Sequence, residues 1–428
     1  MNIELQPQIV TLDNGLRLVL TELPYARSVS ISIYVSAGSR YEATNKDAGL
    51  SHFVEHLCFK GTDNRPDPRT IAAEIDSLGG SFNAATDREL TVYYAKVTPE
   101  RSTEALELLV DLVRNSRFRD EEIERERRVI LEEIAAVEDA PDEQVSVLLD
   151  GLLWPNEPLG RDIAGTPNSI TNLSAQRLRD YYQEQYVANS AVISIAGALT
   201  TRDAMARIEP LVKDWPSGNP TDWVRVGKPP KGPQLRLLEK ETEQTHLSLG
   251  MRSLDAYDDD RYALGLLSIL LGEGMSSRLF IRLREELGLC YDVHSSTSYL
   301  RDTGTFTIHA GIDPTNTLET VREIVSALAH ARLPIESAEL ERAKQQVQSR
   351  IQLQLEDNRA ISAWYGSRLA LDLPLREPEE TIALFEQVTI ENLQQVARRL
   401  IKDEHLQLAV IGPITDAAAL EGAMKLEP

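Results

Sequence analysis

The chain has 428 residues, more than one hydrophobic core usually organises, so two domains are expected. An apolar fraction of 42% and a charged fraction of 26% are those of a globular protein that can bury substantial cores. The 67 acidic residues outnumber the 45 basic ones, and the net charge of −22 disfavours nucleic acid and anionic membranes as partners. The same acidity favours basic partners, or it serves solubility alone.

The N-terminal segment and the cysteines indicate the compartment. Residues 1–20 lack a basic stretch followed by an apolar one, and no apolar run reaches the roughly 20 residues that cross a bilayer. Only two cysteines occur, Cys58 and Cys290, which excludes a disulfide framework and suits a reducing environment. The sequence therefore predicts a cytoplasmic protein with no membrane partner.

The first half of the chain predicts a series of strands and helices. Residues 28–40 alternate like a half-buried strand, and residues 48–62 are apolar with helical spacing. Residues 80–97 form two strand-like runs around a turn, residues 122–139 a long charged helix, and residues 190–199 a closing strand. Residues 214–234 hold five prolines and three glycines, and we expect an inter-domain linker there.

The second half repeats this series, which indicates a duplication. The matching segments are, in the same order, residues 244–255, 262–279, 295–312, 339–357 and 406–414. We therefore predict an α+β fold of two homologous domains, 1–213 and 235–428, joined by the linker. Each domain is expected to hold a mixed, mostly antiparallel sheet covered by helices on one face.

A metal-binding pattern lies in the first apolar helix, within GLSHFVEHLCFKGT. A helix advances roughly 100° per residue, so His52, Glu55 and His56 share one face. Two imidazoles four residues apart can hold one metal ion, and the order His-x-x-Glu-His is the inverzincin pattern. The alternative is two partly buried histidines and a glutamate in an ordinary ion pair. Cys58 is either a redox-sensitive neighbour of the metal or a small apolar residue.

A catalytic zinc ion needs a third protein ligand, which we expect on the long charged helix. Glu126 and Glu133 lie seven residues apart on one face, whereas Glu132 points about 100° away. That pair suits a metal ligand with a supporting partner. A solvated charged face is the alternative.

Three motifs together resemble the pitrilysin, insulinase and mitochondrial processing peptidase family, most closely its short bacterial members. They are HFVEHLCFKGT, ERERRVILEEIAAVED and the segment from Pro158 to Gly197. The resemblance implies that His52, His56 and Glu133 bind one Zn²⁺ per chain, that Glu55 activates water, and that Glu126 supports the site.

The resemblance also implies substrate-binding residues. Arg284 and Tyr291 match a pair that holds substrate and polarises the scissile carbonyl, while Asn83 and Ala84 would pair with an added peptide strand. The alternatives are a surface arginine, an ordinary strand tyrosine and a plain internal strand. The family encloses peptides in a chamber of four such domains, so a homodimer is expected.

The second copy lacks the metal-binding residues, since Ser268, Leu271 and Gly272 stand opposite His52, Glu55 and His56, and Arg350 opposite Glu133. The sequence thus predicts a zinc endopeptidase acting on unfolded or short peptides, with basic peptides favoured. Alternatives are a maturase specific for one precursor and a non-catalytic core or assembly subunit.

Overall fold

The computed structural model describes residues 5–426, which form two compact units. One unit comprises residues 5–134, 162–224 and 352–377, and the other comprises residues 135–161, 225–351 and 378–426. The compact units therefore do not coincide with the two sequence halves. Each unit takes in one segment from the other half, a helical region that packs on its sheet. The homologous halves 1–213 and 235–428 stay a prediction about the duplication.

The first unit is built on a six-stranded mixed sheet in the order β1-β2-β6-β3-β5-β4. The pair β2 and β6 is parallel and the other neighbours are antiparallel. The strands are β1 (Gln8–Thr11), β2 (Arg17–Glu22), β3 (Val29–Val35), β4 (Ser81–Thr86), β5 (Thr91–Val97) and β6 (Ala191–Gly197).

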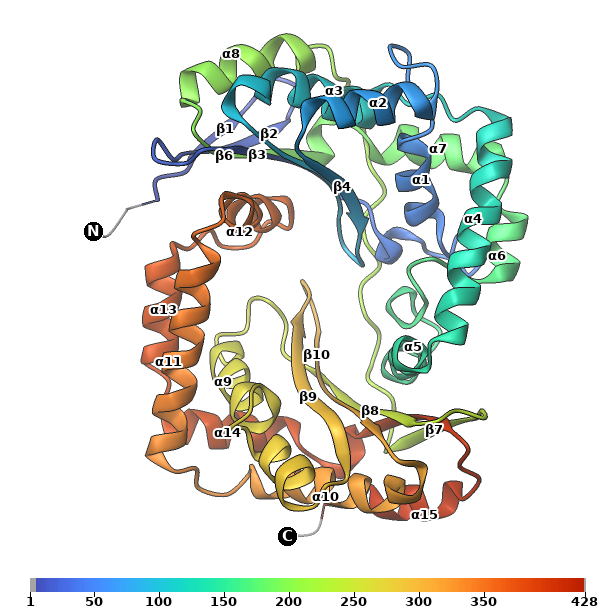
Figure 1. Ribbon diagram of the computed structural model, residues 1–428, viewed down its shortest axis with the longest axis vertical. Helices are drawn as coiled ribbons and strands as arrows, with labels where there is room; N and C mark the ends of the chain where they lie inside the picture. The colour runs from blue at the N-terminus through green and yellow to red at the C-terminus, as the bar shows by residue number, and fades with distance from the viewer. Residues whose placement is uncertain (1–4, 427–428) are drawn as a thin grey trace. The chain divides into compact units, whose positions relative to one another are not determined.

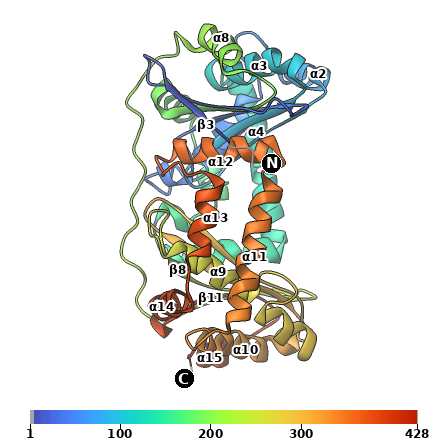
Figure 2. The same cartoon turned by 90° about the vertical axis from the view of Figure 1, so that its left-hand side faces the viewer.

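Helices lie on both faces of this sheet, with α2 and α3 on one side and α12 on the other (Figures 1 and 2). The helices of this unit are α1 (Leu50–Cys58), α2 (Pro68–Leu78), α3 (Ser102–Arg114), α4 (Asp120–Asp139, whose last turn passes into the second unit), α6 (Pro167–Asn172), α7 (Ala175–Gln185), α8 (Thr201–Val212) and α12 (Asn358–Ala370).

The expected half-buried strand at residues 28–40 and the expected one-sided helix cover are both wrong. Every residue of β3 is buried, because α12 covers the face that carries its serines. The Ser362 hydroxyl donates to Ser32 Oγ at 3.2 Å and to Ser194 Oγ at 3.0 Å. Small hydroxyl side chains let the helix approach closely and give the buried polar groups partners.

The second unit repeats the design with five strands in the order β7-β11-β8-β10-β9. Here β7 and β11 are parallel, the other pairs are antiparallel, and α5 packs against β8 and β11. The strands are β7 (Gln234–Glu239), β8 (Thr245–Ser253), β9 (Cys290–Tyr299), β10 (Gly304–Ile312) and β11 (Gln407–Gly412). The helices are α5 (Pro141–Leu153), α9 (Arg261–Gly272), the π-helix η5 (Phe280–Glu286), α10 (Thr317–His330), α11 (Ser337–Gln354), α13 (Pro378–Glu386), α14 (Ile390–Leu400) and α15 (Ala417–Ala423).

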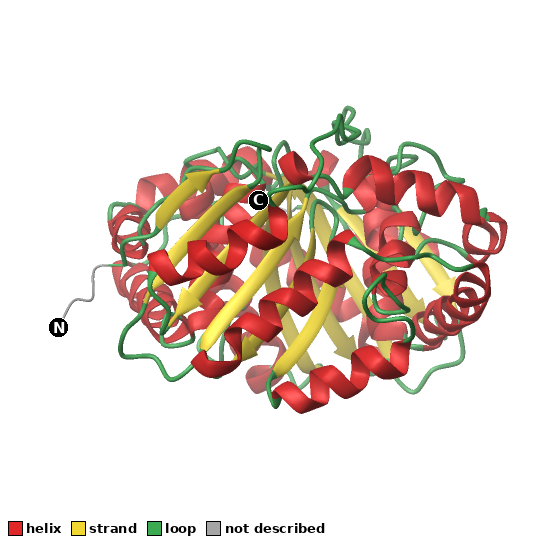
Figure 3. Cartoon of the chain, turned by 90° about the horizontal axis from the view of Figure 1, so that it is seen from above, coloured by secondary structure: helices red, strands yellow, loops and turns green. Residues whose placement is uncertain are grey.

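The two sheets share one connectivity, because β2-β6-β3-β5-β4 and β7-β11-β8-β10-β9 follow the same chain order. Both units contain helices and strands, and Figure 3 colours the two kinds of element along the whole chain. The predicted α+β fold with two homologous, mostly antiparallel sheets is confirmed. Within the described residues, no helix combines the length and apolar character that crossing a bilayer requires.

Candidate metal centre

Helix α1 starts from a cap supplied by a distant side chain. The carboxylate of Glu42 accepts hydrogen bonds from the backbone N–H groups of Gly49 at 3.0 Å and Ser51 at 2.8 Å. Gly49 has a φ of 87°, and a Cβ there would lie 2.4 Å from the carbonyl oxygen of Ala164. A buried carboxylate at this end of the helix accepts hydrogen bonds from N–H groups that would otherwise be unpaired. Its negative charge also interacts favourably with the positive end of the helix dipole.

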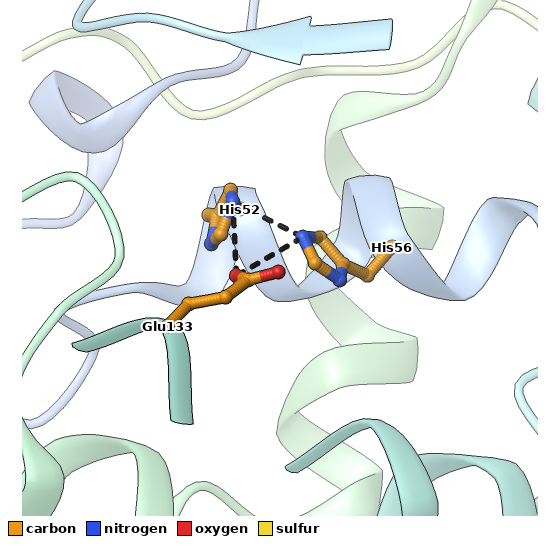
Figure 4. Close-up of side chains that lie close together, drawn as sticks. All are labelled: His52, His56 and Glu133. Carbon is orange, nitrogen blue, oxygen red and sulfur yellow. Dashed lines mark hydrogen bonds and ion pairs between the residues drawn. The ribbon is translucent and has the colours of Figure 1, made fainter. Parts of the chain in front are cut away.

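The structure brings His52, His56 and Glu133 together from α1 and α4 (Figure 4). The two Nε2 atoms lie 3.1 Å apart. Oε2 of Glu133 lies 3.6 Å from Nε2 of His56 and 4.0 Å from Nε2 of His52. In the part of the chain that the structure describes, no other group of three or more His, Cys, Asp or Glu residues converges in this way.

These three ligand atoms fit a zinc ion. Ligands about 2.0–2.1 Å from a tetrahedral zinc stand about 3.4 Å from one another, and the observed separations of 3.1, 3.6 and 4.0 Å bracket that value. Two imidazoles and one carboxylate are a donor set that catalytic zinc sites use, with the fourth position open. The residues present therefore suit the predicted ion.

Glu126 orients His56 from behind. Its Oε1 accepts a hydrogen bond from Nδ1 of His56 at 2.9 Å, which leaves Nε2 directed at the candidate site. Its Oε2 pairs with the ammonium group of Lys60 at 2.8 Å. By contrast, Nδ1 of His52 is buried and makes no hydrogen bond to the described residues. Glu126 is thus buried and engaged, which rules out a merely solvated face.

The electrostatics of the two imidazoles differ. Burial, together with the neighbouring His56, lowers the pKa of His52 to about 4, so this imidazole is neutral and able to act as a ligand at pH 7. Burial would also lower the pKa of His56, but the hydrogen bond to Glu126 and the carboxylates of Glu133 and Glu55 raise it. Cation binding at this site therefore competes with a proton on His56.

Glu55 lies on the same helix and is held by the end of strand β4. Its Oε2 accepts a hydrogen bond from the hydroxyl of Thr86 at 2.5 Å. Burial raises the pKa of Glu55, and the Thr86 hydrogen bond opposes part of that rise. A carboxylate with a raised pKa is suited to accept a proton and later return it.

Asn83 and Ala84 lie on β4, the strand at the edge of the first sheet. This strand pairs with β5 on one side and, among the described strands, with none on the other. The alternative of an internal strand is therefore wrong, and backbone groups along the open edge are available for pairing. Their role in binding peptide stays a prediction.

Arg284 and Tyr291 meet in the second unit, where η5 is followed by β9. The guanidinium carbon of Arg284 lies 4.7 Å from the centre of the Tyr291 ring and 4.8 Å from that of Phe280. The ring of Tyr291 is held by this stacking although the residue is 75% exposed. The predicted pair is thus one physical unit, and its role stays a prediction.

Sequence reasoning missed three residues of this site: Glu42, Lys60 and Thr86. Each contacts a residue of the site or of its helix: Glu42 caps α1, Lys60 pairs with Glu126 on α4, and Thr86 donates to Glu55. Lys60 lies four residues after His56, a helical spacing that is the one available signal, although α1 ends at Cys58 and Lys60 lies in the turn that follows. Glu42 and Thr86 carry no local pattern that separates them from ordinary loop and strand residues.

Comparison with known proteins places this site in a family. Residues 17–167 match the family model described as insulinase (peptidase family M16), and residues 172–347 match that of the peptidase M16 inactive domain. The chain belongs to this M16 family, as its predicted resemblance implied. The second description agrees with a second copy that lacks the metal-binding residues.

Individual relatives cover nearly the whole chain. An uncharacterised zinc protease of Bacillus subtilis, YmxG, is 36% identical over 94% of this chain and 97% of its own length. One from Rickettsia bellii is 35% identical over 94% and 96%. The crystal structure of a protease from Helicobacter pylori superposes with a TM-score of 0.90 at 23% identity, covering 96% of this chain and all of that one, which supports the fold alone.

Proposed function

We propose that this chain is a zinc-dependent endopeptidase that cleaves unfolded or short peptides. The observation that carries the proposal is the convergence of the ligand atoms of His52, His56 and Glu133 beside the buried carboxylate of Glu55. Relatives over 30% identical across the chain are named zinc proteases, which favours the same metal. The single such cluster among the described residues is the reason that we propose one ion per chain.

Each side chain has a distinct task in this proposal. When bound, zinc supplies Lewis-acid chemistry, polarising the peptide carbonyl and making a water acidic near pH 7. Glu55 accepts the proton of the attacking water at its carboxylate and delivers it to the leaving amine. Glu126 keeps Nδ1 of His56 protonated, so that Nε2 carries the lone pair that faces the metal.

Peptide binding is assigned to two further elements. The open edge of β4, at Asn83 and Ala84, adds the peptide as an extra strand, so affinity depends mainly on backbone hydrogen bonds. Arg284 and Tyr291 donate hydrogen bonds to a substrate oxygen that gains negative charge during the reaction. In this proposal the chain itself supplies both the metal-binding residues and the Arg284–Tyr291 pair.

We further propose a cytoplasmic homodimer whose four homologous domains enclose the peptide. A two-fold pair of this chain would supply two zinc sites and two Arg–Tyr pairs. Both cysteines are free, which agrees with a reducing compartment. Sedimentation at micromolar concentration should give the mass of a dimer, and a monomer alone would contradict this assembly.

The test is cleavage of a mixed library of acidic and basic peptides by zinc-loaded protein, with and without a chelator, with cut sites identified by mass spectrometry. Many chelator-sensitive cuts are expected from a general peptidase. One cut motif would instead indicate a maturase specific for one precursor. No cleavage by protein that holds zinc would overturn the proposal and favour a non-catalytic subunit.

A further inference from the structure

The first half of the expected linker is a docked part of the first unit. Residues 214–224 belong to that unit, and side chains hold their backbone at intervals. The side-chain amide of Asn189 donates to the carbonyl of Gly218 at 2.9 Å, and that of Gln185 donates to the carbonyl of Thr221 at 3.3 Å. A connection that only spans a distance needs no such contacts, so the course of this stretch calls for an explanation.

The docked stretch ends at a clamp formed by Arg40, which is 0% exposed. Its Nε donates to the carbonyl oxygen of Val224 at 3.0 Å, and the backbone N–H of Val224 donates to the carbonyl of Arg40 at 3.0 Å. The half-buried ring of Trp223 lies over the guanidinium, with its centre 4.2 Å from the guanidinium carbon. A buried cation is tolerated only with partners around it, and the linker supplies part of them.

Arg40 also holds the turn between β4 and β5. Its Nη1 pairs with Oε1 of the buried Glu89 at 2.6 Å, and its backbone N–H donates to the carbonyl of Arg88 at 2.9 Å. Gly38 packs so closely on this turn that a Cβ would lie 2.5 Å from the carbonyl oxygen of Asp87. The segment that carries Arg40 therefore fixes the turn through side-chain, backbone and packing contacts.

The turn leads directly to the carboxylate that we assign to proton transfer. It begins after Thr86, whose hydroxyl donates to Glu55 at 2.5 Å. Oγ1 of Thr86 also lies 3.2 Å from Oγ1 of Thr91, and the latter donates to the carbonyl of Ala37 at 3.1 Å. Since Ala37 lies three residues before Arg40, one short segment holds both ends of the turn. The place of the Thr86 hydroxyl thus depends on that segment.

The same segment continues into the cap of helix α1. Two residues beyond Arg40, the carboxylate of Glu42 is 1% exposed and accepts hydrogen bonds from the backbone N–H groups of Gly49 and Ser51. The linker, the turn before β5 and the start of the metal-binding helix therefore all contact residues 37–42. Such a junction transmits a displacement of one element to the others, because packed interiors are not freely deformable.

We propose that Arg40 is a positioning residue for peptide cleavage and that the docked linker holds it in place. The inference rests on the proposed function, because it concerns the placement of Glu55. Trp223 and Val224 seat the guanidinium of Arg40, Arg40 fixes the turn, and the turn presents the Thr86 hydroxyl to Glu55. Release of the linker from this clamp slows the chemical step and leaves peptide affinity nearly unchanged.

The first test uses full-length, zinc-loaded protein and the peptides that it cleaves. Trp223→Ala removes a half-buried ring from the clamp and should lower kcat about tenfold, with KM changed by less than about twofold. Trp223→Phe keeps an aromatic face over the guanidinium and should recover most of the rate. Unchanged kcat in Trp223→Ala would overturn the proposal.

Arg40→Lys tests the arginine directly, because a lysine keeps the charge but not the planar fork that reaches Val224 and Glu89 together. Its kcat should fall at least as far as that of Trp223→Ala, and normal kcat in this variant would overturn the proposal. Replacing one member of a buried ion pair can prevent folding, and the Trp223 variants then decide the question.

Trp364→Ala is the matched control within the same unit. Trp364 on α12 is also half-buried and also lies over an arginine, with its ring centre 3.9 Å from the guanidinium carbon of Arg368. Its indole N–H donates to the carbonyl of Arg376, away from the linker and the turn. The control should keep the kcat of the unaltered protein. An equal loss in the control would show general loosening of the unit and would overturn the positioning role.

A double-variant cycle tests the route from the linker to Glu55. Thr86→Val removes the hydroxyl that the clamp is proposed to place. If the linker acts through that hydroxyl, adding Trp223→Ala to Thr86→Val should lower kcat no further, for a total of about tenfold. Independent effects would multiply to about a hundredfold, and that result would overturn the route.

Hydrogen exchange separates the clamp from the peptidase function. In zinc-loaded Trp223→Ala, backbone amides of residues 83–91 should exchange about tenfold faster than in the unaltered protein, whereas Trp364→Ala should leave them unchanged. If the protein cleaves no peptide while exchange responds in this way, the peptidase function fails and the coupling of linker and turn stands. If the protein cleaves peptides but neither exchange nor kcat responds to Trp223→Ala, the positioning role is overturned and the peptidase function stands.

Discussion

The two copies of the fold use the same pair of helices in different ways. In the first copy, α1 presents His52 and His56 to Glu133 on α4. In the second copy, the equivalent helices α9 and α11 carry Ser268 and Arg350 at the matching positions. Between these two residues lies the carboxylate of Glu273, which accepts from the Ser268 hydroxyl and from the guanidinium of Arg350, each at 2.8 Å.

The difference between the two copies lies in whether their buried polar groups have hydrogen-bond partners within the protein. In the second copy the polar groups satisfy one another, so no external ligand is needed. In the first copy two imidazole nitrogens face each other at 3.1 Å, and neither can satisfy the other once both hold lone pairs. A histidine also cannot replace Gly272, since a Cβ there would lie 2.5 Å from the backbone nitrogen of Ser295. Packing at Gly272 thus excludes a histidine at the position equivalent to His56.

The largest effect should come from Glu55, whose counterpart Leu271 is a buried apolar residue. Glu55→Gln should lower kcat about a thousandfold, because the amide cannot accept the proton of water. Zinc content, measured by mass spectrometry of the purified protein, should stay at one per chain, since His52, His56 and Glu133 remain. A variant that retains activity would remove Glu55 from the proposed mechanism.

Among the residues that support the site without binding the metal, Glu126 should have the largest effect, and its counterpart in the second copy is the small residue Ala343. Glu126→Gln removes the charged acceptor that orients His56 and the partner of Lys60. Zinc affinity should fall about 10- to 100-fold, as is usual when a supporting carboxylate is lost. Competition with a chromophoric chelator measures this affinity. Unchanged affinity would mean that α1 packing alone positions His56.

The sequence was sufficient to predict those parts of the site whose arrangement follows from the period of an α-helix. His52, Glu55 and His56 share a face because α-helix geometry requires it, and the alternation of strands predicted most of both sheets. The approach of Glu133 to α1 is a contact between distant segments. Spacing alone did not decide whether Glu126 or Glu133 is the third metal ligand. The family resemblance selected the residue that the structure brings to the two histidines.

Contacts of serine and threonine hydroxyls could not be predicted in the same way. Ser32 and Ser194 look like the exposed side of a half-buried strand, yet both are buried under α12, which comes more than 160 residues later. Thr86 likewise looks like an ordinary strand residue. A short hydroxyl side chain fits water or a buried partner equally well, so only tertiary contacts decide its environment.

Thr86 offers a test of how firmly the first copy holds its glutamate. Thr86→Val keeps the shape of the side chain but removes the hydroxyl that donates to Glu55 at 2.5 Å. We expect kcat to fall about tenfold with little change in KM, because a misplaced carboxylate transfers protons less efficiently. Thr86→Ser restores the hydroxyl and should recover most of the activity. Equal activity in the valine variant would show that Glu55 needs no such support.

The smallest effect on zinc content and cleavage should come from Arg350→Met in the second copy. Its matched variant in the first copy is Glu133→Gln, because the two residues occupy equivalent positions. Glu133→Gln replaces a charged ligand and should reduce both zinc content and cleavage. Arg350→Met breaks an ion pair whose arginine side chain is 45% exposed, so it should lower the free energy of unfolding by less than about 1 kcal/mol. Urea unfolding and zinc analysis of both variants measure this contrast. Loss of zinc from Arg350→Met would mean that the ion pair of the second copy supports the metal site, and the two copies would then have to be treated as one functional unit.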